Sequence, residues 1–332
     1  MSDPSGASAR TAGVLGVGAT GARAARQLAS AEEIDGVVLG GTGERPDALQ
    51  RSLGAAARIG EPIDRGVGVV VLAGPSGTHV EAARRALDLG SHVVSTSDAV
   101  ADVEGLLALD ARARSAGASL VVGAGFSPGL SCVLARHLAG WVDQVDEIHV
   151  SRFGTGGPAC ARQHHRALAA RAVDWRDGEW VRRRGGSGRE LGVFPDPVGS
   201  LDCYRAALPD ALLLHPAFPG ASRIAARQAA NRRQRLLALF PMLIRPHPEG
   251  RIGAVRVEVR GRRGGEMVYE VAGAIDRPAV AAGAVAGLAA RWALAGRFEP
   301  GAAGLAGLVE PVPFLQELSG FGVRAAVFVG VA

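Results

Sequence analysis

The chain contains no lysine, because each of its 37 basic residues is an arginine. Several enzyme classes need a lysine in the active site, and the sequence excludes them. A Walker A loop places a lysine on the β- and γ-phosphates, a pyridoxal enzyme forms a Schiff base with one, and a protein kinase uses the lysine of a strand. Short-chain dehydrogenases that pair a tyrosine with a catalytic lysine are excluded in the same way.

Cysteines and aromatic residues are also scarce. The 3 cysteines, Cys132, Cys160 and Cys203, are far apart and lack the paired spacing of a zinc site or a redox couple. We therefore expect free thiols and no metal site. Only 5% of the residues are aromatic, and the arginine runs at 182–184 and 232–233 lack the interleaved aromatic residues of a nucleic-acid surface. With a net charge of only +5, solvated faces and no nucleic-acid partner are expected.

Long hydrophobic runs are missing as well. The most apolar stretch, 279–290, lies between two arginines and is shorter than the roughly 20 residues that cross a bilayer. Residues 1–11 are small and polar, and the apolar run that follows is part of a glycine-rich turn, which is not the pattern of a signal-peptide core. We expect a soluble, cytoplasmic protein without a membrane partner.

The 332 residues are enough for two domains, and the first apolar run ends in Gly16, Gly18 and Gly21. A strand, a glycine-rich turn and a helix in this order are the context of a dinucleotide-binding motif. The first glycine allows a tight turn, the second lets the backbone approach a pyrophosphate, and the third lets helix and strand pack closely. The pyrophosphate would then lie at the helix N-terminus beside Ala19 and Thr20, where free N–H groups favour negative charge.

The kind of dinucleotide depends on the residues after the second predicted strand, 36–39. An NAD site usually has an acidic residue about 20 positions after the glycine-rich turn, which binds the ribose 2′-hydroxyl. This chain has Gly41 and Thr42 there. The hydroxyl of Thr42 and the guanidinium of Arg45 would suit the 2′-phosphate of NADP. We therefore predict NADP as the cofactor, while Glu44 leaves NAD open.

Strands and helices alternate through the first part of the chain. The valine-rich run at 67–72 is typical of a strand that is buried on both faces of a parallel sheet. The alternation predicts a doubly wound parallel sheet of the Rossmann type. Ligands bind at the carboxyl ends of such strands, which here carry the loops at 16–21, 42–45, 73–79, 95–98 and 123–129.

The pattern changes after residue 130. Alternating apolar residues at 254–261 and 267–273 indicate a hairpin, with its turn at 262–265, in a sheet with one solvent-exposed face. Helices are predicted at 277–294 and 312–318, and a last strand at 323–329. We expect an α/β protein with a dinucleotide-binding domain at 1–130 and an α+β substrate and oligomerisation domain at 131–332. The second domain carries an open, largely antiparallel sheet, and its C-terminal segment is free to pack back on the first domain.

Three motifs together resemble a known family. They are the glycine-rich turn at 16–21, the loop Ala73-Gly74-Pro75-Ser76 with His79, and the segment Gly125-Phe126-Ser127-Pro128-Gly129-Leu130. These motifs are similar to those of the saccharopine dehydrogenase-like oxidoreductases, which are relatives of dihydrodipicolinate reductase and meso-diaminopimelate dehydrogenase. The resemblance implies an NAD(P)-dependent oxidoreductase that acts on a C–N bond of an amino acid or an imine. It extends cofactor binding to Ala73, Gly74, Pro75 and His79, and substrate binding to Phe126.

The catalytic residues of these relatives do not match this chain. The reductases have a His-His pair followed by a lysine and then a glycine-rich turn. Here the glycine-rich turn at 154–158 comes first, the pair His164-His165 follows, and no lysine is present. Diaminopimelate dehydrogenases often carry an aspartate where this chain has Ser127. The catalyst must therefore be sought among other residues.

The turn at 154–158 ends in a proline, which is common at the first position of a helix. Gly156 and Gly157 would then place a helix N-terminus against a substrate carboxylate, with Arg162 as an additional cation. On such a helix His165 shares a face with Arg162, and His164 points about 100° away from His165. One of the two histidines would donate a proton near the nicotinamide. The alternative is that Arg162 and both histidines are surface or interface residues.

Asp98 is a further candidate for the catalytic acid, because it lies in a loop at the ligand-binding edge of the sheet. Its alternative role is to cap the following helix. The predicted function is an NADP-dependent oxidoreductase that reduces an imine, or oxidises an amine, of a small carboxylate-bearing substrate, as a homo-oligomer. Oxidation of a hydroxyl group is a variant of it. A non-catalytic dinucleotide-binding sensor or partner protein is the alternative from another class.

Overall fold

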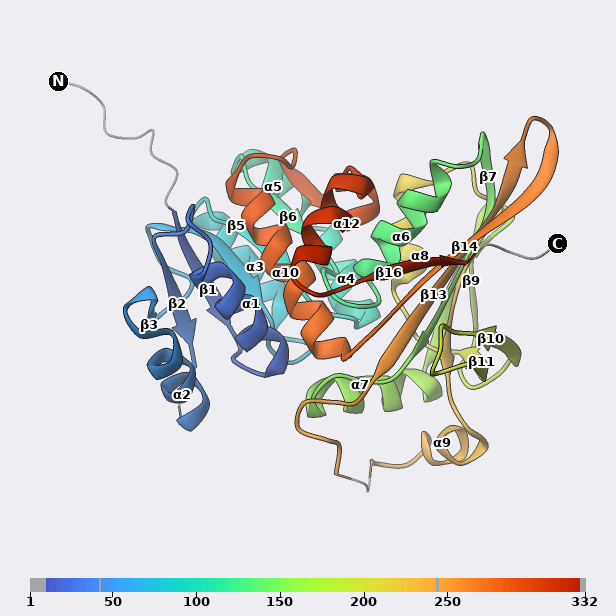
Figure 1. Cartoon of the computed structure of the whole chain (residues 1–332), viewed down its shortest axis with the longest axis horizontal. Helices are drawn as coiled ribbons and strands as arrows, with labels where there is room; N and C mark the ends of the chain where they lie inside the picture. The colour runs from blue at the N-terminus through green and yellow to red at the C-terminus, as the bar shows by residue number, and fades with distance from the viewer. Residues whose placement is uncertain (1–9, 42, 243–244, 329–332) are drawn as a thin grey trace.

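The computed structural model describes residues 10–41, 43–242 and 245–328. Two β-sheets lie side by side in this part of the chain, with helices packed against each of them (Figure 1). The first sheet is built mainly by the N-terminal half of the chain. The second sheet lies on the right of Figure 1 and is seen nearly edge-on there. The predicted α/β class with a Rossmann-type sheet and a second α+β unit is confirmed.

The first sheet has seven parallel strands in the order β15-β6-β5-β4-β1-β2-β3. The strand order reverses between β1 and β4, and this is the place where doubly wound sheets bind ligands, outside the carboxyl ends of the strands. The strands are β1 (Thr11–Leu15), β2 (Gly36–Gly40), β3 (Ala57–Ile59), β4 (Val67–Leu72), β5 (His92–Ser95), β6 (Ser119–Val121) and β15 (Gly301–Ala303).

Helices connect these strands and cover the sheet. β4 is buried along nearly its whole length, which explains its run of valines. The connecting helices are α1 (Ala19–Ala29), α2 (Glu44–Leu53), α3 (His79–Asp88), α4 (Val100–Leu107) and α5 (Asp110–Ser115), with the short 3-10 helix η1 (Gly54–Ala56) after α2.

The C-terminal part of the chain contributes to both sheets. Helix α10 (Pro278–Leu294) packs against α1, β4 and β5, and β15 then pairs with β6. Helices α11 (Leu305–Leu308) and α12 (Pro311–Gly320) follow and pack against α6 (Leu130–Ala139). The final strand, β16 (Ala325–Phe328), pairs with β14 in the second sheet. The first sheet therefore needs segments from both ends of the chain.

The second sheet has nine strands, and its main path runs in the order β10-β11-β12-β7-β13-β14-β16. Within the described residues its neighbours pair antiparallel, apart from the parallel pair β7 and β12. Its other strands are β7 (Gln144–Phe153), β8 (Arg171–Arg176), β9 (Glu179–Arg184), β10 (Glu190–Val193), β11 (Ser200–Arg205), β12 (Arg223–Ala229), β13 (Gly253–Arg263) and β14 (Glu266–Asp276). The helices of this unit are α6, α7 (Pro158–Ala169), α8 (Asp210–Leu214), η2 (His215–Ala217) and α9 (Arg232–Leu237).

The predicted hairpin is present and longer than the apolar alternation indicated. β13 and β14 continue to a tight turn at Gly264 and Gly265, both of which have positive φ angles. The extra residues at its tip are exposed and charged, so hydrophobic alternation could not reveal them. The last strand begins at Ala325, two residues later than predicted, and residue 329 lies outside the described part.

One apolar core passes from the first sheet into the second. On β7 and β13 the side chains of Ile148, Val150, Val255 and Val257 point toward this core, and the alternate side chains point to the other face of the sheet, called here the outer face. Within the described segments no helix is both apolar and long enough to cross a membrane.

Candidate functional site

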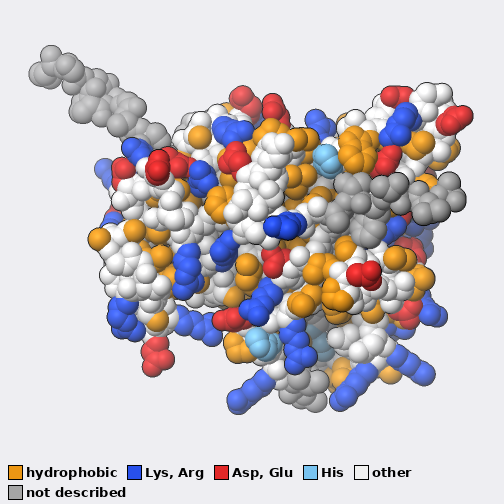
Figure 2. Space-filling model, viewed as in Figure 1, with side chains coloured by type: hydrophobic (Ala, Val, Ile, Leu, Met, Phe, Trp, Pro, Cys, Tyr) orange, Lys and Arg blue, Asp and Glu red, His pale blue; other side chains and the backbone are white. Residues whose placement is uncertain are grey.

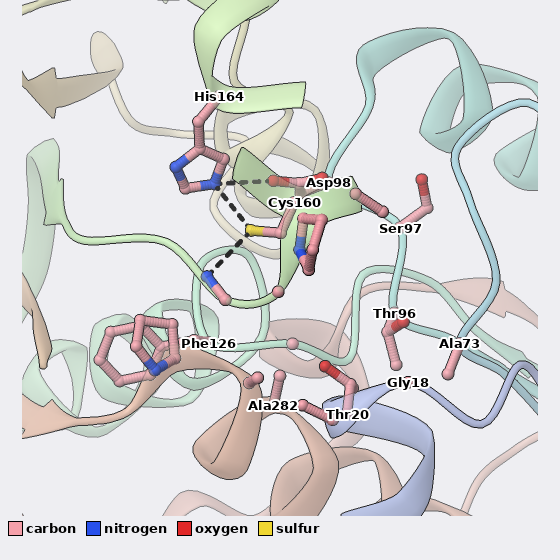
Figure 3. A pocket seen from close by; sticks show the side chains of 18 of the residues that line it. Gly18, Thr20, Ala73, Thr96, Ser97, Asp98, Phe126, Cys160, His164 and Ala282 are labelled. Atoms are coloured by element: carbon pink, nitrogen blue, oxygen red, sulfur yellow. Dashed lines mark hydrogen bonds and ion pairs between the residues drawn. The ribbon is translucent and has the colours of Figure 1, made fainter. Parts of the chain in front are cut away.

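A cleft of about 270 Å³ opens at the carboxyl ends of the first sheet and extends to the beginning of α7 (Figure 3). One wall comes from the glycine-rich turn, the second from the loops after β4, β5 and β6, and the third from β7 and α7. The cleft is thus formed jointly by the two units. Of the cofactor- and substrate-binding residues predicted from the sequence, those that line it are Gly18, Ala19, Thr20, Arg45, Ala73, Gly74, Phe126, Gly156, Gly157 and Arg162.

The glycine-rich turn has the geometry that a pyrophosphate requires. An added Cβ on Gly18 would meet no atom within 4 Å, so this residue opens directly into the cleft. Gly16 has a φ of +98°, and a Cβ on Gly21 would lie 1.9 Å from the carbonyl oxygen of Gly16. These two glycines therefore shape the turn and do not line the cleft. Helix α1 has no side-chain cap and no acidic residue in its first turn, which leaves its N-terminus available to an anion.

His79 supports the neighbouring loop from behind. Its Nε2 donates to the carbonyl oxygen of Gly74 at 3.0 Å, and the hydroxyl of Ser95 donates to its Nδ1 at 2.9 Å. Burial lowers the pKa of His79 below its ordinary value, which keeps the ring neutral in this arrangement. Neither His79 nor Pro75 lines the cleft. They lie under or beside the loop at Ala73 and Gly74, which does line the cleft.

The end of the cleft beside β2 holds Arg45, the second residue of α2. Its side chain is exposed at the rim, and α2 has no side-chain cap at its N-cap residue, Gly43. Thr42, the other residue predicted to contact a 2′-phosphate, lies outside the described residues. The described residues on β2 and its exit, 36–41, include no acidic side chain.

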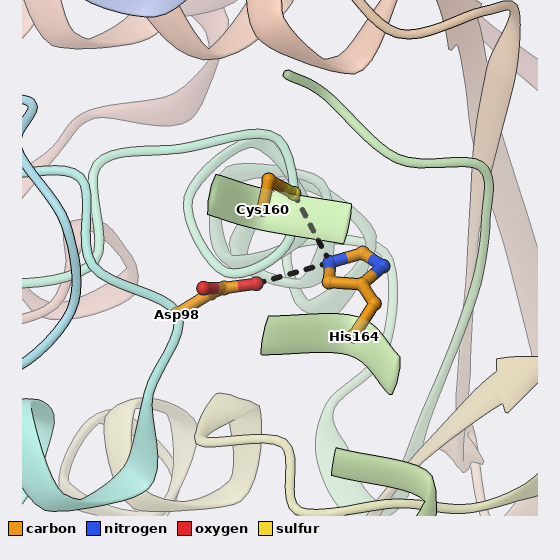
Figure 4. Close-up of side chains that lie close together, drawn as sticks. All are labelled: Asp98, Cys160 and His164. Atoms are coloured by element: carbon orange, nitrogen blue, oxygen red, sulfur yellow. Dashed lines mark hydrogen bonds and ion pairs between the residues drawn. The ribbon is translucent and has the colours of Figure 1, made fainter. Parts of the chain in front are cut away.

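A cluster of three side chains, called here the acid–base cluster, lies at the opposite end of the cleft (Figure 4). The Nε2 of His164 is 3.0 Å from Oδ2 of Asp98 and 3.4 Å from Sγ of Cys160. The backbone N–H of Gly156 donates to the same sulfur at 3.4 Å. Cys160 and His164 are four residues apart on α7, so they share one face of the helix. Asp98 follows β5, and the N-cap of α4 is Ala99, so Asp98 does not cap that helix.

The charges in the acid–base cluster stabilise one another. Burial lowers the pKa of His164 and Arg152 lowers it further, but the interactions with Cys160 and Asp98 outweigh both, and the net shift is upward. Burial raises the pKa of Asp98, but the hydrogen bond and charge of His164, together with Arg152, outweigh it, and the net shift is downward. Both shifts favour an imidazolium that donates to a carboxylate, which is an ion pair facing the cleft.

The same three donors are close enough to share one metal ion, since their ligand atoms lie within 4.8 Å of one another. However, a guanidinium N–H of Arg152 donates to Oδ2 of Asp98 at 3.2 Å, the same oxygen that faces the histidine. The guanidinium of Arg152 at Oδ2 of Asp98 and a proton on Nε2 of His164 are both compatible with a network of hydrogen bonds in the acid–base cluster. We therefore treat the acid–base cluster as a proton-transfer group.

Arg152 is the most buried charged residue of the site, with 2% of its surface exposed. Besides Asp98, it donates to the carbonyl oxygen of Ser127 at 2.8 Å and to Oε1 of Gln228 at 3.1 Å. Nε2 of Gln228 in turn donates to the carbonyl oxygen of His164 at 3.1 Å. These bonds tie β7, β12, α7 and the loop after β6 together, so Arg152 positions the acid–base cluster.

The loop after β6 is held from its other side by Asp210. The hydroxyls of Ser127 and Ser131 donate to its Oδ1 at 3.0 and 2.8 Å, and its Oδ2 is buried without a partner. Burial raises the pKa of this carboxyl. Asp210 has no exposed surface and does not line the cleft, so its place is to support the loop that carries Phe126.

Helix α7 begins as the sequence predicted, with Gly157 at the N-cap and Pro158 at the first position. Gly156 and Gly157 line the cleft, and Arg162 reaches its rim with an exposed side chain. Phe126 is almost fully buried and forms part of the apolar wall (Figure 3). A positive group, a helix N-terminus and an apolar wall therefore surround the acid–base cluster.

His165 does not belong to the cleft. Its Nε2 donates to the carbonyl oxygen of Phe240 at 2.8 Å, outside the lining of the cleft. Of the two histidines, only His164 lines the cleft together with Arg162. The buried residues of α7 are Ala161, His164, Ala167 and Leu168, and the three apolar ones alone mark the inner face on which His164 lies.

Two residues of the site have no counterpart in the sequence-based prediction, namely Cys160 and Arg152. The i, i+4 spacing of Cys160 and His164 is the signal that could have joined them. Arg152 occupies an inward position on β7, two residues after Val150 and four after Ile148. A charged residue that continues an inward apolar alternation indicates a buried functional or supporting group.

Comparison with known proteins gives a likeness in structure alone. No family model matches the chain, and none of the curated proteins matches it. Saccharopine dehydrogenase (L-Glu forming) from Saccharomyces cerevisiae is similar over 96% of this chain and 100% of its own, with a TM-score of 0.70 and 15% identity. DAP dehydrogenase of C. glutamicum, solved in complex with DAP, covers 91% of this chain and 95% of its own, with a TM-score of 0.51 and 13% identity.

An amine dehydrogenase from Mycobacterium smegmatis is also similar, over 88% of this chain and 94% of its own, with a TM-score of 0.50 and 13% identity. At these identities the comparisons establish the fold of the whole chain. They confirm the two-unit dehydrogenase architecture that the three motifs of the sequence implied.

Proposed function

We propose that this protein is an NADP-dependent oxidoreductase that acts on the C–N bond of a small carboxylate-bearing substrate. One observation carries the proposal. The glycine-rich turn, with its open Gly18, and the acid–base cluster of Asp98, Cys160 and His164 line one continuous cleft. A dinucleotide bound along that cleft would extend from α1 toward a group able to transfer protons. The fold shared with saccharopine, DAP and amine dehydrogenases supports the same substrate class.

The residues of the first unit fit a nicotinamide dinucleotide. The N-terminus of α1, with Ala19 and Thr20, would hold the pyrophosphate, and the loop at Ala73 and Gly74 would lie along the rest of the cofactor. Arg45 would bind the 2′-phosphate, for which a guanidinium offers two parallel hydrogen bonds. The bound cofactor supplies or accepts a hydride, and the protein needs only to position it and to manage one proton.

His164 is the proposed proton donor in the direction of imine reduction. The interactions with Cys160 and Asp98 raise the pKa of His164 above its ordinary value, which favours the protonated ring, and its Nε2 lies between Asp98 and Cys160. In the direction of amine oxidation the same nitrogen accepts the proton. Asp98 and Arg152 hold the ring in place, and Arg162 with the N-terminus of α7 would bind the substrate carboxylate.

Cofactor titrations test the first half of the proposal. The purified protein is titrated with NADPH and with NADH while the nicotinamide fluorescence is followed. Arg45→Ala should weaken NADPH binding by about tenfold or more, since it removes a charge-assisted contact, and should leave NADH binding unchanged. An equal loss for both cofactors would refute the 2′-phosphate contact, and no binding of either would refute the dinucleotide site.

The alternative of a non-catalytic dinucleotide sensor has its own test. The protein is supplied with NADPH, ammonia and a set of small 2-keto acids, or with NADP and the corresponding amino acids, and absorbance at the nicotinamide band is recorded. Turnover that is lost in His164→Gln supports the enzyme. Tight NADPH binding without turnover on any of these substrates would favour the sensor.

A further inference from the structure

A second polar cavity lies on the outer face of the second sheet, away from the cleft. Its lining includes five arginines from four strands, Arg176, Arg183, Arg205, Arg223 and Arg227, together with Asp174. The cross-strand register brings these side chains together, because Arg205 pairs with Arg227 and β8 pairs with both β9 and β12. Five guanidinium groups thus converge on one small space, and that of Arg176 is paired with Asp177 at 3.3 Å.

The acidic side chains nearby neutralise these arginines only in part. Asp174 lies 3.3 Å from Arg227 and 3.9 Å from Arg205, and Glu190 lies 3.5 Å from Arg227 and 3.8 Å from Arg223. Charge-assisted hydrogen bonds are about 2.7–2.9 Å long, so these contacts are loose. On the same face Glu258 binds Arg256 at 2.7 Å and Arg260 at 2.6 Å. Apart from Arg176 and its partner Asp177, four arginines face the two carboxylates of Asp174 and Glu190, which leaves an excess of two positive charges.

Two of the buried guanidinium nitrogens have no hydrogen-bond partner. These are Nε of Arg205 and Nε of Arg227, and Arg227 has only 3% of its side chain exposed. An unpaired buried donor on a charged group is costly for the folded protein. Burial lowers the pKa of Arg205, and the charge of Arg227 lowers it further. The unpaired Nε atoms and the lowered pKa of Arg205 both indicate a site with more positive than negative charge.

Two other acidic groups near the cavity are already engaged, whereas Glu179, opposite Arg176 in the ladder, has no ion pair among the described residues. Glu147, which lies opposite Arg223 in the ladder, accepts from Nε2 of His149 at 2.7 Å and faces Arg260 at 3.7 Å. Asp177 pairs with Arg176 at 3.3 Å. Arg183 has no ion pair within the described part of the chain, although its neighbour Arg182 donates to Glu104 at 3.1 Å.

We infer that this arginine cavity is a binding site for a phosphate-type oxyanion, either the free ion or the phosphoryl group of a small metabolite. The convergent guanidinium groups and the two unpaired Nε atoms are the donors that such an anion needs. The cavity measures about 40 Å³. One water needs about 10–15 Å³ of such space, so the cavity admits a phosphoryl group but not a whole nucleotide.

The position of the cavity connects it to the cleft. Arg227 faces the cavity, and the next residue on β12, Gln228, faces inward and binds Arg152 and the backbone of His164. Arg227 of the anion site and Gln228, which holds Arg152 and His164, therefore lie on opposite faces of one strand. The site is separate from cofactor binding, so its test does not depend on the proposed function.

Calorimetric titration of the full-length protein with inorganic phosphate tests the site, at constant ionic strength and with saturating NADP to fill any phosphate site of the cofactor. One phosphate per chain is expected, with a rise in melting temperature. A parallel titration with glucose 6-phosphate distinguishes the two sources of the anion: tighter binding than phosphate identifies a phosphorylated metabolite, and weaker binding identifies the free ion.

Arg183→Gln and Arg205→Gln should each weaken phosphate binding by about tenfold or more. Arg183 is exposed and unpaired, so its variant should fold normally, as checked by circular dichroism. The matched control is Arg182→Gln, because the alternation of β9 turns that side chain to the opposite face. Binding that is unchanged in both cavity variants, or that chloride abolishes equally in all proteins, would overturn the inference.

A second copy of the chain could supply the missing negative charge instead. Analytical ultracentrifugation with and without phosphate decides this. If the protein is a dimer that does not bind phosphate and that dissociates in Arg183→Gln, the arginines belong to an interface between copies, and the anion site is refuted.

Discussion

Adjacent histidines on α7 have opposite environments. His164 is 6% exposed and pairs with Asp98, whereas His165 is partly exposed and contacts a backbone carbonyl in another segment. A rotation of about 100° between neighbours on a helix is enough to separate them. Only one of the two can therefore act in the cleft, and the pair offers a matched comparison.

His164→Gln should lower the rate of imine reduction by about 10²–10⁴-fold, the usual contribution of a general acid. In the native protein the rate should fall as pH rises through the pKa of His164, which lies above its ordinary value. The same sign applies to stability: the contribution of the protonated ring is complete below the unfolded pKa and is lost as pH rises through the folded one. Steady-state rates and urea unfolding between about pH 5 and 10 measure both effects.

The control is His165→Gln, which should keep the native rate and the native pH profile. A similar loss in both variants would show that the mutations act through the helix and not through the proton donor.

The glycines of the first turn also differ residue by residue. Gly18→Ala should fold with native stability, or up to about 1 kcal/mol more, because the new Cβ meets no atom and the backbone is compatible with alanine. It should weaken NADPH binding by about tenfold or more, since that space is reserved for the pyrophosphate. Gly21→Ala should lose about 1–3 kcal/mol of stability, because its Cβ would overlap the carbonyl oxygen of Gly16. Thermal melts and fluorescence titrations of the two variants separate these effects.

At the scale of elements, α10 is the helix that fixes the glycine-rich turn. It is buried on all sides, and it approaches α1 closely at Gly283. An added Cβ at this position would lie 2.5 Å from the carbonyl oxygen of Thr20 and 2.6 Å from Cβ of Arg23. Helix α10 can therefore approach the cofactor helix this closely only with glycine at the contact.

Gly283→Ala should lower the free energy of unfolding by about 1–3 kcal/mol and should weaken NADPH binding, because Thr20 lines the cleft. Gly307→Ala, in α11, serves as control: its Cβ meets nothing within 4 Å, so stability should stay the same or rise slightly. Denaturant unfolding of both variants, followed by cofactor titration, provides the measurement. A stable Gly283→Ala protein with native cofactor affinity would contradict the proposed packing.

At the scale of the whole molecule, the first sheet depends on both ends of the chain. α10 covers β4 and β5, and β15 adds a strand beside β6. Side chains on every side of α10 are buried, so removing it would expose a large apolar surface on the sheet.

Arginine and acidic side chains are interspersed on the face shown in Figure 2, and several arginines project along its lower edge.

The segment 1–130 should therefore not fold alone, although it contains the complete dinucleotide motif. Its circular dichroism spectrum should be largely disordered, or the fragment should aggregate. Joining 1–130 to 277–308 through a glycine-serine linker should restore a cooperative thermal transition and NADPH binding. A stable, cofactor-binding 1–130 fragment would contradict this dependence.

Much of the fold could be predicted from the sequence because the relevant signals are local. These signals are a valine-rich strand, a glycine-rich turn and the alternation at 254–261. In each of them a few adjacent residues indicate the type of element and where it ends. The sequence could not assign β15, a three-residue strand rich in small residues, because its pairing with β6 is entirely non-local. The turn of the hairpin lies within the predicted 262–265, but the strands extend further toward it than the alternation indicated, because the exposed charged residues there follow no apolar period.

The sequence by itself determined the dinucleotide-binding turn, the parallel sheet and the start of α7, since each depends on the backbone preferences of adjacent residues. Only the tertiary structure brought together the residues that we propose as the catalytic group. Asp98, Arg152, Cys160 and His164 come from three elements, and their contact depends on how α7 rotates and how β7 meets the loop after β5. The same holds for the arginine cavity. Local sequence encodes conformation, but the charges that a side chain meets are set by packing between segments far apart in the chain.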